Sequence, residues 1–341
     1  MTNAVEFDNV SIVFGDTPQQ ALPLMDEMKD RADVQLETGQ ILGVHNCSVN
    51  VADAEILVLM GLSGSGKSTL LRAVNGLNSV VRGSVRVNNN GEMVDITNAH
   101  PKLLRHMRQH QISMVFQQFG LLPWRTVREN VSLGLELGGM AKTEKIERVD
   151  RQLELVHLNG WAERKVGELS GGMQQRVGLA RAFVTDAPIL LMDEPFSALD
   201  PLIRTRLQDE LLDLQRDLKR TIIFVSHDLD EAFKLGDRIA IMEGGRIVQC
   251  GTPQEIYTNP INDYVSEFVA HMNPLGVLCA RNLAEPTTET PLVTVNADAN
   301  IREVMAKLDD STQVIGVVDA DGLIGQISKD RVLAKLVDPR T

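Results

Sequence analysis

The chain has 341 residues, of which 43% are hydrophobic, and it carries a formal net charge of −12. This length and apolar content suffice for two domains with packed cores. The acidic balance argues against a nucleic-acid partner, and no run of about 18 apolar residues is present to cross a membrane. The three cysteines are widely spaced and predict neither a disulfide framework nor a metal site.

Short apolar runs alternate with helical stretches between Phe7 and Gln249, which predicts a layered α/β core. The strand candidates are residues 56–60, 112–116, 189–192, 221–225 and 238–242. Near the N-terminus, residues 16–46 form a segment with an expected amphipathic helix around 22–36. Helical periodicity without a strand pattern over residues 118–184 predicts an inserted helical subdomain.

The most informative motif is Gly61-Leu-Ser-Gly-Ser-Gly-Lys-Ser-Thr69, which directly follows the apolar run 56–60. Glycine permits a tight turn whose N–H groups face an anion, and the next helix directs its positive end there. Lys67 supplies a cation for the β- and γ-phosphates, and the Ser68 hydroxyl is placed to ligate Mg²⁺. A glycine-rich turn that carries a lysine by chance is the alternative, but the full pattern favours nucleoside triphosphate binding. The predicted loop residues are Gly61, Ser63, Gly64, Ser65, Gly66, Lys67, Ser68 and Thr69.

A second anion site is predicted in the stretch Leu169-Ser-Gly-Gly-Met-Gln-Gln-Arg176. Ser170 stands at an N-cap position, and Gly171 and Gly172 leave backbone amides bare at the start of a helix. Taken alone, this pattern is typical of a well-capped structural helix. In a chain that also carries the phosphate loop, we interpret it as part of the nucleotide site.

Two carboxylates end the apolar strand candidate at 189–192. A carboxylate at a strand end near the phosphate loop can hold the Mg²⁺ shell, which suits Asp193. Glu194 is then placed to orient and deprotonate a water that attacks the γ-phosphate. An apolar strand followed by Asp-Glu is also common on plain protein surfaces, so the assignment depends on the phosphate loop.

The composition changes after Asn282, where a polar linker at 283–291 precedes a small unit at 292–341. This unit begins with an amphipathic helix from Ile301 to Leu308, with Asn300 as its N-cap. Its other predicted elements are a strand at 313–318, a turn at 319–322, a strand at 323–327 and a last helix from 329.

Taken together, the motifs resemble the ABC ATPase family in order and spacing. The stretches that carry the resemblance are Gly61–Thr69, Gln117, Leu169–Arg176, Ile189–Glu194, Ser197–Asp200 and His227. The resemblance implies an α/β P-loop NTPase core over residues 1–282, with the helical subdomain at about 118–184. It implies ATP and Mg²⁺ as ligands and a homodimer in which two nucleotide domains close head-to-tail.

The resemblance also implies roles for residues around the phosphate loop. Phe14 corresponds to the aromatic residue that stacks on adenine, its alternative being a core residue. Gln117 senses Mg²⁺ and the γ-phosphate. His227 holds the γ-phosphate and positions Glu194, its alternative being a histidine satisfied within the fold. The catalytic candidates are therefore Glu194, His227 and Gln117, and the metal candidates are Ser68, Gln117 and Asp193.

In the family, each signature helix caps the ATP that the other domain holds. The resemblance implies that Ser170 and Gly172, with Gly171 between them, contact the partner's γ-phosphate. Asp200 lies in the loop that joins the two sites.

Several stretches resemble the ATPases of importers for glycine betaine, choline and related quaternary amines. They include Glu37–Gly39, Ser197–Arg204, Ser226–Ala232 and Asn259–Val265. This resemblance implies two integral membrane permease subunits, an extracytoplasmic substrate-binding protein and a peripheral place on the cytoplasmic face of the plasma membrane. The alternative is a soluble ABC ATPase that remodels a cytosolic complex without transport.

Two further segments bear on that choice. Phe119–Val127 is apolar and partly aromatic, and in transporters this region receives a membrane subunit, although ordinary core packing also explains it. The unit at 292–341 resembles a single cystathionine-β-synthase (CBS) repeat, carried by Val314–Asp319 and Gly322–Gly325. Relatives usually carry two such repeats in tandem, so an intact ligand cleft within one chain is not implied.

Overall fold

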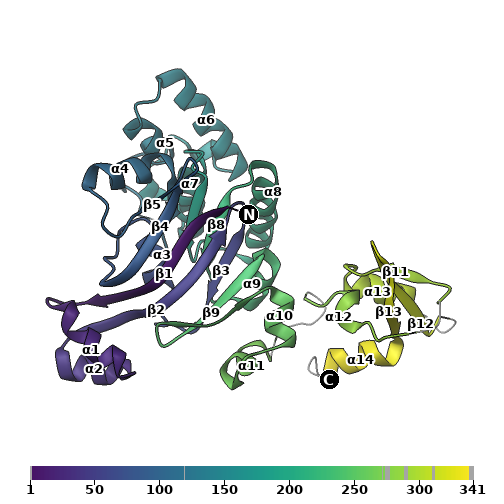
Figure 1. The fold of residues 1–341 in the computed structure, drawn as a ribbon. Coiled ribbons are helices and arrows are strands. Elements are labelled where there is room, and N and C mark those ends of the chain that lie inside the picture. Colours follow the sequence, from purple (N-terminus) through teal and green to yellow (C-terminus); the bar gives the residue numbers. More distant parts are fainter. Residues whose placement is uncertain are drawn as a thin grey trace. The chain divides into compact units, whose positions relative to one another are not determined.

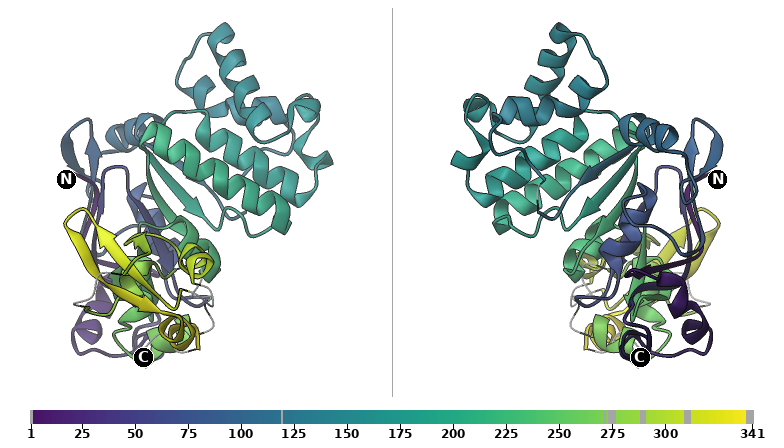
Figure 2. Two further views of the ribbon diagram at one scale, coloured as in Figure 1. Left: turned by 90° about the vertical axis from the view of Figure 1, so that its right-hand side faces the viewer. Right: turned by 90° about the vertical axis from the view of Figure 1, so that its left-hand side faces the viewer.

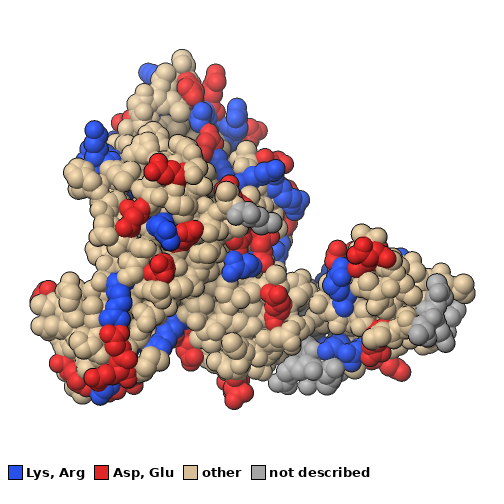
Figure 3. Space-filling view, in the orientation of Figure 1, with Lys and Arg blue, Asp and Glu red and all other residues tan. Residues whose placement is uncertain are grey.

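The computed structural model describes residues 2–118, 120–270, 272, 277–287, 291–308 and 312–337. The chain divides into two compact units (Figure 1). The first consists of Met1–His227 and Ile241–Ile247, and the second of Asp228–Ala240 and Val248–Thr341. On the face drawn in Figure 3, acidic and basic side chains are interspersed over the first unit.

An antiparallel sheet of four strands, in the order β2-β1-β4-β5, forms one layer of the first unit. Its strands are β1 (Asn3–Phe14), β2 (Ile41–Ala52), β4 (Arg82–Asn89) and β5 (Glu92–Asp95). None of them is among the strand candidates, because polar residues interrupt their apolar positions and only part of each strand is buried. Phe14 ends β1 and pairs with Ile41 at the start of β2.

A six-stranded sheet, in the order β10-β9-β3-β8-β7-β6, carries the nucleotide motifs. Its strands are β3 (Ile56–Met60), β6 (Ile112–Val115), β7 (Ile189–Asp193), β8 (Thr221–Val225), β9 (Arg238–Glu243) and β10 (Arg246–Gly251). All five strand candidates are confirmed to within one residue at each end. Strands β3, β7 and β8 are buried at every position, as expected for parallel strands covered on both faces.

The parallel pairing decides where the functional candidates lie. Strands β3 and β8, β8 and β7, and β7 and β6 all pair in parallel. Their carboxyl ends therefore share one edge of the sheet, where ligands bind in open α/β sheets. The phosphate loop follows β3, Gln117 follows β6, Glu194 follows β7 and His227 follows β8.

The region between β6 and β7 consists of helices and loops without a strand in its described residues 116–118 and 120–188, as predicted; Phe119 lies outside them. Figure 2 shows its helices, coloured teal, projecting to one side of the sheets. The helices of the first unit after β3 are α3 (Lys67–Val74), α4 (Pro101–His110), α5 (Val127–Leu137), α6 (Lys142–Leu155), η2 (Asn159–Trp161), η3 (Val166–Glu168), α7 (Gly171–Phe183) and α8 (Pro201–Leu218).

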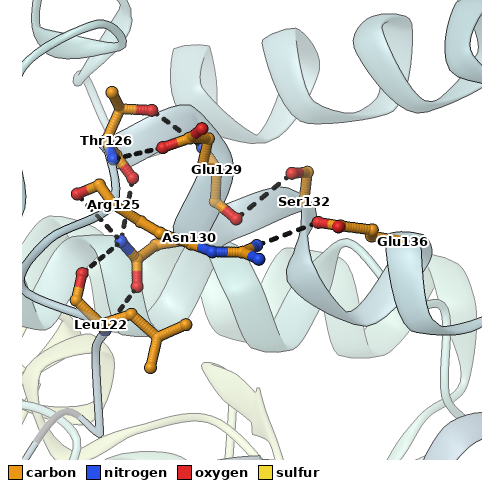
Figure 4. A network of polar contacts seen from close by, with 7 residues as sticks. All are labelled: Leu122, Arg125, Thr126, Glu129, Asn130, Ser132 and Glu136. Carbon is orange, nitrogen blue, oxygen red and sulfur yellow. Dashed lines mark hydrogen bonds and ion pairs between the residues drawn. The ribbon is translucent and has the colours of Figure 1, made fainter.

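The loop before α5 is held by a buried amide (Figure 4). The side chain of Asn130 accepts a hydrogen bond from the Leu122 N–H at 2.8 Å and donates to the carbonyls of Leu122 and Thr126 at 3.1 and 2.9 Å. Thr126 and Glu129 form a capping box at the start of α5. Because Asn130 is fully buried, these bonds fix the backbone of residues 122–126.

The prediction of one amphipathic helix at 22–36 is wrong. The segment between β1 and β2 folds as η1 (Pro18–Ala21), α1 (Leu22–Asp26) and α2 (Arg31–Thr38). Met28 adopts a positive φ of 62°, which an α-helix does not allow, and the Asp30 side chain caps α2 by accepting from the Asp33 N–H. We call residues 16–40 the insertion.

The second unit contains α9 (Leu229–Leu235), α10 (Pro253–Thr258), α11 (Asp263–Val269) and α12 (Ala280–Leu283). Its C-terminal part is a sheet in the order β11-β12-β13 with two helices. These elements are β11 (Thr294–Asn296), α13 (Ile301–Lys307), β12 (Val314–Asp319), β13 (Gly322–Ser328) and α14 (Lys329–Val337). The two predicted strands and two predicted helices are confirmed, including the Asn300 cap, whereas β11 was not predicted.

The segment before this sheet is bonded to it. Glu285 and Gln326 exchange two backbone hydrogen bonds of 2.9 Å, and the Ala280 N–H donates to Ala299 at 2.8 Å. Within the predicted linker, residues 288–290 lie outside the described residues, as do 309–311 and 338–341 of the predicted unit. The boundaries at 282 and 291 stay predictions.

Candidate nucleotide-binding site

The phosphate loop has a backbone that only glycine fits at two positions. Gly61 has a φ of 142°, and a Cβ atom there would lie 2.1 Å from the Met242 carbonyl oxygen. Gly66 has a φ of 99°, and a Cβ would lie 2.6 Å from the Gly43 carbonyl oxygen. At these two glycines the loop backbone therefore packs directly against the backbone of Met242 and Gly43, where a side chain would not fit.

Lys67, the first residue of α3, is buried within this loop. Its ammonium group donates to the carbonyl oxygens of Gly61 and Leu62 at 2.8 and 2.9 Å. Burial lowers the pKa of Lys67, while the carboxylates of Glu194 and Asp193 act in the opposite direction. The cation is therefore positioned in advance at the start of a helix, where an anion is stabilised.

Ser68 and Asp193 meet at the edge of the sheet. The Ser68 hydroxyl donates to an Asp193 carboxylate oxygen at 2.6 Å, and Arg72 pairs with the other oxygen at 2.8 Å. The Asp193 side chain is fully buried. A hydroxyl and a carboxylate are the hard oxygen donors that Mg²⁺ prefers, and Mg²⁺ usually takes one or two carboxylates together with substrate phosphates.

No group of three or more His, Cys, Asp and Glu side chains is arranged to hold a metal in the described part of the chain. The Ser68 hydroxyl and the Asp193 carboxylate are donors that fit an Mg²⁺ ion arriving with a nucleotide.

Glu194 lies where two other candidates converge. Its Oε2 atom accepts a hydrogen bond from the Gln117 amide at 3.0 Å and lies 3.6 Å from Nδ1 of His227. The Glu194 backbone has a positive φ of 48°, an uncommon conformation for a residue other than glycine. Buried Gln175 of α7 donates to the Glu194 carbonyl oxygen at 3.3 Å and so helps to hold this turn.

A cavity of about 550 Å³ joins these elements. The predicted residues that line it are Phe14, Ser63, Gly64, Gly66, Lys67, Ser68, Thr69, Gln117, Glu194 and His227. Phe14 is 40% exposed, so the alternative of a core residue is wrong. Arg31, Ile41 and Gly43 also line the cavity, and none of them was predicted. No sequence pattern indicates them, because the insertion and β2 meet the phosphate loop only in the folded chain.

The second anion site does not line this cavity. Ser170 caps α7, its hydroxyl accepting from the Met173 N–H at 3.4 Å, and both Ser170 and Gly171 are exposed. Asp200 is exposed and caps α8 by accepting from the Ile203 N–H at 3.1 Å. The two candidate anion sites are therefore separate within one chain. The contact of Ser170 and Gly171 with a nucleotide, which the family resemblance implies, would need a second chain.

Comparison with known proteins identifies the family. The family described as ABC transporter matches residues 44–197. The glycine betaine/proline betaine transport system ATP-binding protein ProV of Salmonella typhimurium is 43% identical over 338 residues, which are 98% of this chain and 83% of that protein. The chain belongs to the ABC transporter ATP-binding proteins. The glycine betaine transport ATP-binding protein OpuAA of Bacillus subtilis is 48% identical over 279 residues, 82% of this chain and 66% of that protein.

A solved structure agrees with this family. The dimeric, post-hydrolysis state of the ATP-binding cassette MJ0796 with ADP and Pi gives a TM-score of 0.63 at 30% identity, over 73% of this chain and 98% of that one. As an ABC transporter ATP-binding protein, the chain has the α/β cassette fold, binds ATP with Mg²⁺ and hydrolyses ATP. No helix in the described part of the chain combines the length and apolar character that a membrane crossing requires.

Proposed function

We propose that the chain drives the uptake of a quaternary amine osmolyte, such as choline or glycine betaine, by hydrolysing ATP. The carrying observation is the match to ProV, because it extends over the C-terminal unit as well as the cassette. OpuAA, named for glycine betaine transport, supports the same substrate class over 82% of this chain. Both relatives are named as ATP-binding proteins of transport, which favours an importer over a soluble remodelling ATPase.

Within the site, we assign the loop at 61–69 to the phosphates and Phe14 to the adenine. Ser68, Asp193 and Gln117 would hold Mg²⁺, which neutralises phosphate charge when bound. Glu194 accepts the proton of the water that attacks the γ-phosphate, so that ADP and inorganic phosphate form. The 3.0 and 3.6 Å contacts of its Oε2 atom give Gln117 and His227 the task of orienting that carboxylate.

We assign Ser170, Gly171 and Gly172 to the γ-phosphate of a partner chain, with Asp200 beside them. The exposure of Ser170 and Gly171 at the start of α7 supports this assignment, since N–H groups at a helix start attract anions. A homodimer closed by ATP follows, and hydrolysis removes the bridging phosphate and lets the two chains part.

We infer that two permease subunits dock near residues 120–127 and that a substrate-binding protein delivers the substrate on the far side of the membrane. The protein would then be peripheral on the cytoplasmic face. Trp124 is 69% exposed on the loop that Asn130 fixes, and a neighbouring cavity of about 320 Å³ includes Phe116 and Leu137 in its lining. A rigid loop that presents an exposed aromatic residue is suited to a protein interface.

The C-terminal unit at 292–341 is proposed to regulate transport rather than to supply activity. Its single CBS-like sheet is consistent with pairing between the units of two chains.

The decisive experiment purifies the tagged chain from detergent-solubilised membranes of its natural host and identifies what accompanies it. We expect a membrane subunit, and we expect cells that carry the intact system to take up labelled choline or glycine betaine. Trp124→Ala should lose the membrane subunit but keep the ATPase activity of the isolated chain. Trp161→Ala is the matched control, because Trp161 is 42% exposed elsewhere among the same helices. Recovery with ribosomes or other soluble complexes would overturn the importer assignment.

A further inference from the structure

We propose that Arg31 of the insertion is a positioning residue for the nucleotide phosphates. It binds the Gly64 carbonyl of the phosphate loop and places a positive charge beside the site, and no carboxylate of the described residues pairs with that charge. This inference rests on the proposed role of the phosphate loop and is independent of the transported substrate.

The guanidinium of Arg31 spans two elements. One terminal nitrogen donates to the Gly64 carbonyl oxygen and the other to the Gly43 carbonyl oxygen of β2, each at 2.5 Å. Both glycines and Arg31 line the nucleotide cavity. The planar guanidinium can hold two acceptors in fixed directions, which a lysine cannot do. Arg31 therefore neutralises the partial negative charge of the Gly64 carbonyl, which would otherwise repel a phosphate.

Within the described part of the chain, the charge of Arg31 lacks a counter-ion. Among the described residues no carboxylate forms an ion pair with it, although the insertion is rich in acidic residues. Asp26 pairs with Arg82, and Glu37 pairs with Lys29. The Nε atom of Arg31 is also buried without a hydrogen-bond partner. A partly buried cation in this condition is stabilised when an anion arrives, and the adjacent cavity admits the phosphates.

The insertion is attached to the first unit by contacts that do not involve Arg31. Arg82 of β4 forms a two-pronged pair with Asp26, at 2.5 and 3.0 Å. Buried Met25 and Val34 pack in a hydrophobic cluster with Leu42 of β2. Loss of either the Arg31 contacts or the Arg82 pair should therefore leave the insertion in place, because the buried hydrophobic cluster remains.

The test measures displacement of a fluorescent ATP analogue from the full chain by ATP, ADP and adenosine. Arg31→Met keeps the aliphatic stem and removes the charge. It should weaken the binding of ATP and ADP by about tenfold, which is the scale of a hydrogen bond to a charged group, and leave the affinity for adenosine unchanged. The KM for ATP should rise while kcat changes little, because the Glu194 contacts are untouched. Arg82→Met is the matched control, and it should bind ATP within about twofold of the parent chain.

Lys67→Ala separates the two possible failures. If Lys67→Ala abolishes ATP binding while Arg31→Met binds normally, the Arg31 proposal is wrong and the phosphate-loop assignment stands. If Lys67→Ala also binds normally, the loop assignment itself fails. If Arg31→Met and Arg82→Met lose ATP affinity equally, or if adenosine affinity falls in parallel, Arg31 only stabilises the insertion and the proposal is wrong.

Discussion

Helices α3 and α7 both start at a glycine-rich turn, but the surroundings of the two helix starts differ. Helix α3 follows Gly66 and helix α7 begins with Gly171 and Gly172, so each presents backbone N–H groups at its start. The start of α3 is enclosed, with Lys67 buried and Ser68 bonded to buried Asp193. The start of α7 is capped by Ser170, and both Ser170 and Gly171 are exposed. The enclosed start of α3 suits nucleotide binding within one chain, and we propose that the exposed start of α7 supplies half of a site that another chain completes.

The largest effect is expected from the group that reacts at the enclosed site. Glu194→Gln removes the proton acceptor but keeps the size of the side chain. ATP hydrolysis should fall at least about 100-fold while ATP binding remains, and ATP should hold the variant as a dimer. Steady-state ATPase assays and size-exclusion chromatography with and without ATP check both parts. Glu136→Gln, a change at an exposed ion pair with Arg125, is the control. Near-normal turnover in Glu194→Gln would rule out its role as the base.

A smaller effect is expected at the exposed helix start. A Cβ atom at Gly171 meets no atom within 4 Å, so Gly171→Asp leaves the single chain unstrained. The added carboxylate should repel the partner's γ-phosphate and lower ATPase activity about tenfold or more, without weakening ATP binding to the single chain. Gly167→Asp is the matched control, because that nearby position is exposed and equally open. If Gly171→Asp hydrolyses ATP normally, α7 does not complete a site in a second chain.

The sequence predicts the enclosed site well because its residues follow continuous apolar strands. Parallel pairing then brings Gln117, Glu194 and His227 to the edge that holds the phosphate loop. The antiparallel sheet is harder to predict, since the strands β1 and β2 owe their form to pairing with each other.

Arg31 is missed for a different reason. Its contact with Gly64 joins residues far apart in the sequence, and a local break at Met28 separates α1 from α2, which begins at Arg31. Neither a long-range contact nor a local break of this kind leaves a periodic pattern in the sequence.

The smallest effect is expected from removing the C-terminal unit. This removal tests whether the cassette that contains both helix starts is active by itself. A cut after Ala270 avoids α12, which a cut at 282 would sever. The shortened chain should keep its ATPase activity and ATP affinity within about twofold. MJ0796 supports this expectation, because nearly all of that cassette aligns with 73% of this chain. The matched full-length variant is Gly325→Val, whose Cβ would lie 2.5 Å from the Glu285 carbonyl oxygen and disrupt the tail alone. Loss of ATPase activity in both variants would show that the cassette needs the C-terminal unit for its structure. Altered transport with normal ATPase activity would show that the C-terminal unit is a regulator.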